Sequence, residues 1–290
     1  MEHKKRNITG LTFLILGIVV LVIGIIAINN TDMSKYGTSH SGELETFTEE
    51  FSADGIENIK IDLGENDYSI IFDENAANIT VHSEDLYKDS YTVKKEDDTF
   101  EIETKDHTYK FWKFNFHFIN IDYSKFNDIH SITDLGKLFD SYDGKVTVTF
   151  PARLYDEVKL SSGVGDVYIR GCECKEFDLS AGVGNVELEN VKADSSRFSA
   201  GMGNIDGKGI DFESFNLSAG VGNVDLSGFV GDTKISCGVG DVIMHIKNDS
   251  HNYDIDEDEA DIHTGGKETS DKKYDMKISS GIGDCDIYFE

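Results

Sequence analysis

Basic residues are scarce in this sequence. The chain has 290 residues, of which 27 are Lys or Arg and 55 are Asp or Glu, so its formal net charge is −28. Proteins that bind nucleic acid rely on Lys and Arg side chains that meet phosphate groups, and an acidic surface repels those groups. The charge balance therefore excludes nucleic acid as a partner.

Signatures of catalysis and of metal binding are also missing. The sequence has four cysteines, which are Cys172, Cys174, Cys237 and Cys285. The first two form a C-E-C pair that lacks the second ligand pair of a usual zinc site, so we interpret all four as structural residues or free thiols. No Ser-His-Asp or Cys-His pattern is present, and we predict no enzyme and no catalytic, cofactor-binding or metal-binding residues.

One long uncharged run lies near the N-terminus. Residues 8–28 read ITGLTFLILGIVVLVIGIIAI, a length that spans the hydrocarbon core of a membrane as a helix. Lys4, Lys5 and Arg6 precede it, which predicts a cytoplasmic segment 1–7 and an extracytoplasmic chain after the helix. No A-x-A cleavage site follows, so we predict an uncleaved single-pass anchor in the cell membrane. The part after residue 30 has 24 basic and 54 acidic residues, a net charge of −30.

Three glycines recur every seven residues in this predicted helix: Gly10, Gly17 and Gly24. They would lie near one helix face, where missing side chains allow a second helix to approach closely. This pattern indicates a possible homodimer through the helix. The alternative is that glycine is simply common in membrane helices.

The rest of the chain contains a repeat built on G-x-G-[DN]. The first glycine of each copy is Gly163, Gly182, Gly201, Gly220, Gly238 and Gly281, at intervals of 19, 19, 19, 18 and 43 residues. A fixed period in this range predicts a repeat architecture. Residues 29–55, which are polar, are interpreted as a tether, and residues 56–290 as the repeat domain.

Apolar residues alternate before and after each glycine pair. Aligning the six copies gives three columns of equivalent residues that share one face of a strand, and we expect all three to point inward. The columns are Leu160, Leu179, Phe198, Leu217, Ile235 and Ile278; Ser162, Ala181, Ala200, Ala219, Cys237 and Ser280; and Val164, Val183, Met202, Val221, Val239 and Ile282. The next column, from Val167 to Cys285, comes three residues later, so the chain turns a corner there. The serines from Ser161 to Ser279 are expected to form an outward ladder.

This pattern predicts an all-β fold, a right-handed parallel β-helix of about 19-residue coils, preceded by one transmembrane helix. Glycine suits the corner because a bend often needs positive φ, and the following Asp or Asn can bond nearby backbone amides. An up-and-down antiparallel sheet is the alternative, but identical corners fit best when each stacks on its own copy.

Other meanings of the G-x-G-[DN] motif fit less well. A nucleotide-binding loop needs a helix after the glycines, whereas a strand follows every copy here. Calcium-binding β-rolls have an additional glycine and a different acidic position, and three of the six corners carry neutral Asn. The insertion 247–274 holds an acidic loop, residues 251–261, flanked by His251 and His263, where calcium or another hard metal is an alternative to a solvated loop.

Catalysis on a β-helix would need differentiated partners. Glu187, Asp206 and Asp225 align on the outer face as a uniform ladder, with nothing to separate an acid from a base. A metal-dependent or carbohydrate-directed enzyme therefore remains only the alternative to a non-enzymatic function.

An aromatic insertion interrupts the pattern at residues 108–142. YKFWKFNFHFINIDY, residues 109–123, predicts a strand pair or hairpin, and residues 124–142 have helical spacing. The insertion would either cap the open end of the solenoid or expose an aromatic patch that docks on lipid, cell wall or a protein partner.

The repeats resemble the putative-adhesin family of bacterial surface proteins, a domain family of unknown function. The match is VTVTFPARLYDEVKLSSGVGDVYI, residues 146–169, with its five later copies, and IKIDLGENDYSII, residues 59–71, resembles an earlier coil. The resemblance implies a β-solenoid and no catalytic residues. It favours a membrane-anchored, extracytoplasmic adhesin or a protein that binds or senses the cell envelope.

Overall fold

The computed structural model describes residues 44–104, 109–111, 114–116, 144–248, 250–256, 261–263 and 273–289. These residues form strands, joined by turns and by one 3-10 turn, η4 (Ser250–Asn252). Residues 8–28, with Gly10, Gly17 and Gly24, lie outside the described residues. Within the described ranges, no helix is long and apolar enough to cross a membrane.

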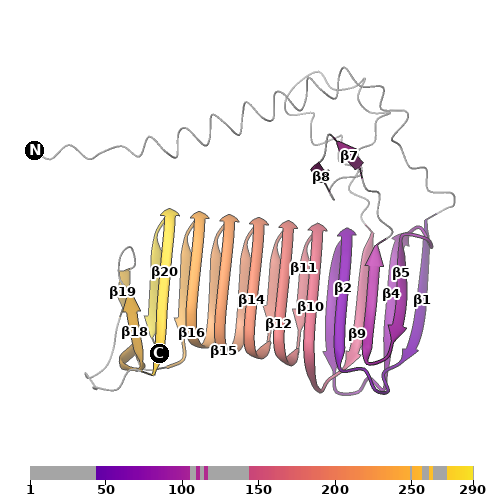
Figure 1. Ribbon diagram of the computed structural model, residues 1–290, viewed down its shortest axis with the longest axis horizontal. Helices are drawn as coiled ribbons and strands as arrows, with labels where there is room; N and C mark the ends of the chain where they lie inside the picture. Colours follow the sequence, from indigo (N-terminus) through magenta and orange to yellow (C-terminus); the bar gives the residue numbers. More distant parts are fainter. Residues whose placement is uncertain are drawn as a thin grey trace, which may run out of the picture. The chain divides into compact units, whose positions relative to one another are not determined.

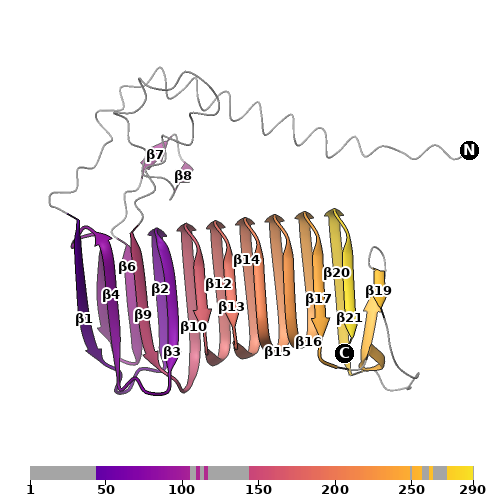
Figure 2. The same cartoon turned by 180° about the vertical axis from the view of Figure 1, so that it is seen from behind.

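The strands stack side by side in a solenoid whose coils each contribute to two sides (Figures 1 and 2). The first side contains, in spatial order, β5 (Tyr91–Glu96), β6 (Thr99–Thr104), β2 (Asn58–Glu65), β10 (Leu154–Val164), β12 (Glu173–Val183), β14 (Lys192–Met202), the later parts of β15 (Ile205–Val221) and β16 (Val224–Val239), β20 (Tyr274–Ile282) and β18 (Tyr253–Asp256).

The second side follows the same stack. It contains β1 (Glu45–Ser52), β4 (Asn78–Leu86), β9 (Lys145–Pro151), β3 (Asp67–Asp73), β11 (Val167–Arg170), β13 (Val186–Glu189), the first parts of β15 and β16, β17 (Val242–Ile246), β21 (Cys285–Phe289) and β19 (Asp261–His263).

The repeat period sets the register between coils. Leu160 pairs with Leu179, which pairs with Phe198, and the equivalent residues continue in parallel register to Ile278. The six repeat coils, joined by these five pairings, therefore stack residue on equivalent residue. This confirms the predicted all-β repeat fold and excludes the up-and-down antiparallel alternative for the described repeats.

The core fills the space between the two sides. The column from Leu160 to Ile278 is buried, as is the column from Val167 to Cys285 across the corner. Aromatic rings continue the packing from coil to coil: the ring centroids of Phe177 and Phe198 are 5.5 Å apart, and those of Phe198 and Phe215 are 5.1 Å apart. Stacked coils thus bury a continuous core that no single coil could form.

The N-terminal end of the stack is closed by antiparallel strands. β4 pairs antiparallel with β9, β1 pairs antiparallel with β4, and β5 pairs antiparallel with β6. Residues 45–52 belong to the segment that the sequence predicts as a tether, but they form β1, in which Phe47 and Phe51 lie on the same strand face and pack against the core.

Both ends of the solenoid contain a coil that is out of sequence order. At one end, β2 and β3 lie between the coil of β6 and β9 and the coil of β10 and β11. At the other, β20 and β21 lie between β16 and β17 on one flank and β18 and β19 on the other. Figure 1 shows this as a break in the colour order, with yellow β20 inside orange β18 and β19.

The acidic insertion supplies that last coil. Tyr253–Asp256 and Asp261–His263 are strands, not a wholly solvated loop as the charge pattern predicts. Tyr253 pairs with Tyr274, and its ring is 2% exposed, so one buried aromatic holds the insertion in the stack. Residues 257–260, which carry part of the acidic cluster, lie outside the described residues.

Candidate interaction surfaces

Two surfaces of the solenoid could bind a partner, and the first of them follows the repeated corner between the first and second sides. We call this corner the glycine edge, defined by the second glycine of each copy: Gly165, Gly184, Gly203, Gly222, Gly240 and Gly283. Their φ angles lie between +133° and +143°, where glycine is strongly favoured. A Cβ at Gly203 would lie only 1.9 Å from the carbonyl oxygen of Gly184 in the preceding coil. Glycine is therefore required there by both conformation and space.

Polar side chains connect neighbouring corners through hydrogen bonds. The side chain of Asp166 accepts a hydrogen bond from the backbone N–H of Asn185 at 2.7 Å, and Asn185 accepts one from the N–H of Asn204 at 3.1 Å. The same bond recurs from Asp67 Oδ1 at the N-terminal end to Asp241 Oδ1 at the C-terminal end. The sequence predicts bonds to nearby amides, but the structure directs each of them to the next coil.

The first surface is a row of exposed aliphatic side chains at the apex of the glycine edge. We call it the apolar ridge, and it consists of Val164, Val183, Met202, Val221, Val239 and Ile282, paired in register. Five of the six are 40% to 63% exposed, and Val164 is half-buried. This corrects the prediction that the column points inward.

The reason for the correction is the position of the turn. The last inward side chain before the corner is the small residue of each copy, such as Ala181, and the next is Val186. The chain bends between them, so the residue between the two glycines lies on the outside of the bend. The alternation indicated a corner but placed it one residue too late.

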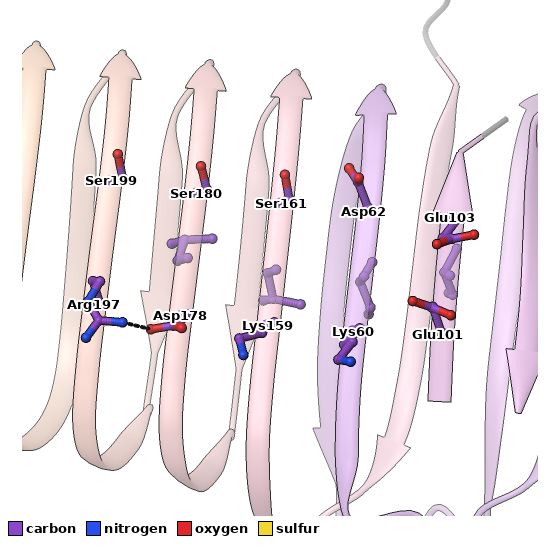
Figure 3. Close-up of a pocket in the computed structure, with 14 residues that line it drawn as sticks. Lys60, Asp62, Glu101, Glu103, Lys159, Ser161, Asp178, Ser180, Arg197 and Ser199 are labelled. Atoms are coloured by element: carbon purple, nitrogen blue, oxygen red, sulfur yellow. Dashed lines mark hydrogen bonds and ion pairs between the residues drawn. The ribbon is translucent and has the colours of Figure 1, made fainter. Parts of the chain in front are cut away.

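The second surface is an open groove of about 420 Å³ that crosses β6, β2, β10, β12 and β14 on the first side (Figure 3). Leu160 and Leu179 lie beneath it. Its outward polar side chains are Lys60, Asp62, Glu101, Glu103, Lys159, Ser161, Asp178, Ser180, Arg197 and Ser199. Ser161, Ser180 and Ser199 stand in one row, as predicted, and Lys60, Lys159 and Arg197 contribute to a second row.

Several charges of the groove are paired, either with each other or with residues beside the groove. Arg197 Nη1 lies 3.3 Å from Asp178 Oδ1, and Lys94 Nζ lies 2.5 Å from Glu103 Oε2. Lys159 donates a hydrogen bond to Glu157, which raises the pKa of the lysine. Lys60 forms no ion pair within the described part of the chain. The groove is thus a polar, mixed-charge surface with donors and acceptors in rows, not a basic site for phosphate.

The aligned carboxylates that the sequence analysis weighed for the alternative enzyme hypothesis lie in one ladder. Glu187, Asp206 and Asp225 are exposed and pair in register on the second side, which is a uniform ladder. Among the described residues, no three His, Cys, Asp or Glu side chains are placed to hold a metal ion.

The four cysteines lie in the core. Cys172, Cys174, Cys237 and Cys285 form no disulfide, and each is no more than 4% exposed. Cys172 Sγ lies 4.0 Å from Cys174 Sγ, and burial raises the pKa of the Cys172 thiol well above its ordinary value. All four are therefore packing residues, and their burial keeps reagents away from the thiols.

The aromatic insertion leaves the solenoid at the glycine edge. Glu103 pairs with Asp62 and Lys145 pairs with Asp67, so the chain leaves β6 and enters β9 at the level of the corner that Gly64–Asn66 make in the neighbouring coil. Within the insertion, β7 (Tyr109–Phe111) and β8 (Phe114–Phe116) pair antiparallel, which confirms the predicted strand pair. The predicted helix in residues 124–142 lies outside the described residues.

The family of the chain follows from these coils. The family described as Toastrack DUF4097 matches residues 56–289, which is most of the chain. The chain belongs to this Toastrack family. The resemblance to a putative-adhesin domain of unknown function is thereby confirmed. No curated protein matches the chain.

Several solved structures are similar to this Toastrack chain. A putative adhesin from Bacteroides fragilis is 14% identical, covers 87% of this chain and is itself fully covered, with a TM-score of 0.42. A putative cell adhesion protein from Clostridium sporogenes is 13% identical, with coverage of 86% and 100% and a TM-score of 0.40. A putative lipid binding protein from Parabacteroides distasonis is 14% identical, with coverage of 85% and 98% and a TM-score of 0.32. At these identities the structures say nothing of what this chain binds.

Proposed function

We propose that this Toastrack protein is a non-enzymatic, membrane-anchored binding protein of the bacterial cell surface, of the adhesin type. Its ligand would be an extended, hydroxyl-rich polymer of the envelope, such as a cell-wall glycan. The groove over β6, β2, β10, β12 and β14 supports this proposal, because it repeats the same kinds of polar side chain from coil to coil.

The spacing of the groove suits a polymer better than a small molecule. Neighbouring strands lie about 4.8 Å apart, so each row offers a hydrogen-bonding group at that interval across the groove. An open surface encloses a small ligand poorly, whereas a chain of sugars can form weak bonds with several coils at once. Serine hydroxyls, Lys60 and Arg197 donate to sugar hydroxyls, and the carboxylates accept from them.

The proposed membrane anchor is the uncharged segment 8–28. If it spans the cell membrane with Lys4, Lys5 and Arg6 inside, the solenoid is presented outside the cytoplasm. There, its net negative charge would keep it apart from other acidic surface components.

Ligand binding in the groove can be tested with a substitution that fills it. Ser180 lies within the groove, and Ser236 is an exposed serine of the same row but three coils away. Detergent-solubilised full-length protein should sediment with purified cell wall, and Ser180→Trp should abolish sedimentation because the indole occupies the ligand's place. Ser236→Trp should sediment like the unchanged protein.

Two results would contradict the proposal. The unchanged protein could remain in the supernatant with cell wall from the native host, which would mean that the groove has no such ligand. Equal sedimentation of both tryptophan variants would place the binding surface elsewhere.

A further inference from the structure

The point at which the chain joins the solenoid lies on the glycine edge. Glu45, at the start of β1, pairs with Leu86. Gly144 fits against Leu86 and Asn66, since a Cβ there would lie 2.8 Å from Leu86 Cδ2 and 2.7 Å from Asn66 Oδ1. Gly165 stacks on Asn66 in turn, with 2.0 Å between an added Cβ and the Asn66 carbonyl oxygen. The start of β1, the ends of the aromatic insertion and the apolar ridge therefore share one edge.

The six repeat corners of this edge carry little charge in a chain whose net charge is −28. The three central corners, residues 179–186, 198–205 and 217–224, contain no charged residue. The outer three, residues 160–167, 235–242 and 278–285, contain one aspartate each. Anionic lipid headgroups would repel most of the acidic surface, but the repulsion is smallest along this edge.

The shape of the apolar ridge helps to identify what it binds. It is a single file of aliphatic side chains, about 24 Å long at the strand spacing of a sheet. Half-exposed side chains of this size offer roughly 300 Å² in total. A stable protein interface needs about 800 Å² from each partner, so the ridge alone falls short of what a second copy requires. A row of aliphatic tips can instead enter the headgroup region of a bilayer without a complementary surface.

We propose that the glycine edge lies against the lipid bilayer and that the apolar ridge inserts into its headgroup region. The proposal rests on the membrane anchor of the proposed function and assigns the orientation of the solenoid. Residues 29–43 separate the predicted span from Leu44, and if they are a tether, as their composition predicts, their r.m.s. end-to-end distance is about 20 Å. Such a short connection holds the start of β1, and with it the edge, near the membrane.

The arrangement has a functional consequence for the groove. The groove opens on the first side, away from the apex of the edge. With the edge on the bilayer, the first side stands upright, and a polymer in the groove would run parallel to the membrane. The ridge thus fixes the height and direction at which the ligand is held.

The experiment measures the distance of two labelled sites from lipid. Met202 lies on the ridge, and Asp194 is an exposed residue nearer the other end of the same strand, β14. Full-length protein carrying Met202→Cys or Asp194→Cys is labelled with an environment-sensitive fluorophore, which the four buried native thiols do not compete for. Each protein is reconstituted in phosphatidylcholine vesicles that contain nitroxide-labelled lipid, and binding is checked by flotation.

We expect the fluorophore at position 202 to be blue-shifted and to lose most of its emission to the nitroxide, with position 194 unaffected. Adding Val183→Asp and Val221→Asp beside the label should abolish this quenching. The thermal unfolding midpoint should stay unchanged because both side chains are exposed.

Three outcomes would overturn the proposal. Floating protein with no quenching at position 202 would retain the anchor and reject the orientation. A blue shift without quenching, together with disulfide formation between Met202→Cys protomers, would identify a second copy as the occupant. Protein that does not float would overturn the anchor and the orientation together, while sedimentation with cell wall tests the groove independently.

Discussion

The buried Tyr253 shows how a single side chain joins two distant parts of the chain. Its hydroxyl donates a hydrogen bond to the carbonyl oxygen of Val230 and accepts one from Asn248 Nδ2 at 3.2 Å. Its ring lies 5.4 Å from that of Tyr274 and 5.2 Å from that of Phe289, measured between centroids. Burial of the hydroxyl raises the pKa of Tyr253 to about 12. The acidic insertion is thus attached through an uncharged phenol.

This pKa predicts alkaline sensitivity. A tyrosine whose folded pKa lies above its unfolded value stabilises the fold fully below about pH 10, and that contribution is lost as the pH rises towards 12. Tyr253→Phe should lose about 1 kcal/mol of unfolding free energy at neutral pH, because Val230 loses its donor. The difference in unfolding free energy between the unchanged protein and the Tyr253→Phe variant should narrow at high pH. Urea denaturation at about pH 8 and about pH 11 measures it, and a constant gap would reject the prediction.

The residue types explain which site features could be predicted. Leu160 and its equivalents are buried and Ser161 and its equivalents are exposed, because simple alternation governs a straight strand. Val183 and Met202 were expected in the core because the alternation in the sequence continues through the first glycine of each copy. The two glycines flank the apex of the bend, but the alternation alone does not show that the residue between them points outward.

At the scale of the element, the corner depends on contacts between coils as much as on local conformation. Gly203 has a φ of +138°, and the carbonyl oxygen of Gly184 occupies the place of a Cβ. The Asn204 side chain bonds the N–H of Asn223 in the following coil. Each corner is therefore complete only when its neighbours are in place.

The corner glycines should tolerate no side chain. Gly203→Ala should lower the free energy of unfolding by about 3 kcal/mol or more, because strain and a clash with backbone add together. Gly55 is the matched control: its φ is +73°, but no atom lies within 4 Å of an added Cβ. Gly55→Ala should cost only about 1 kcal/mol. Equal losses in urea denaturation would show that stacking does not determine the need for glycine.

At the scale of the molecule, the aromatic insertion stands in the sequence between β6 and β9, where a coil of the solenoid makes its corner. The neighbouring coil makes the same corner with Gly64, Glu65 and Asn66, and Gly144 lies beside Asn66. The core at this position comes from strands outside the insertion, such as β6 and β9 with Phe100 and Phe150.

The insertion should therefore be removable. Replacing residues 105–143 with Gly-Glu, which restores a corner like that of Gly64–Asn66, should leave the thermal unfolding midpoint within a few degrees of the original, since surface loop length affects stability weakly. A control that removes the same residues without the two-residue corner should unfold at a lower temperature. Loss of cooperative unfolding in the Gly-Glu variant would show that the insertion caps the solenoid.

The sequence indicated the coils but not their order. The period of 19 residues predicts which residues stack between Gly163 and Gly238, because those coils follow one another directly. The segment 251–263 carries no glycine corner and many acids, so its strands are not visible in the pattern. The pairing of Tyr253 with Tyr274 decides its place, and a contact of that kind depends on how the chain returns, not on local preference.

The out-of-order coils impose a sequence of events on folding. A chain that emerges from its N-terminus first can pair β2 with β6 before β10 exists, and the central coils can then add one after another. The C-terminal end cannot grow in this way, since β18 has no partner until β20 arrives to pair with both β16 and β18. The final residues of the chain thus close the stack from within. A protein shortened by a few tens of residues at its C-terminus would lose two coils instead of one. Its β16 and β17 would then form an open sheet edge with unpaired backbone groups.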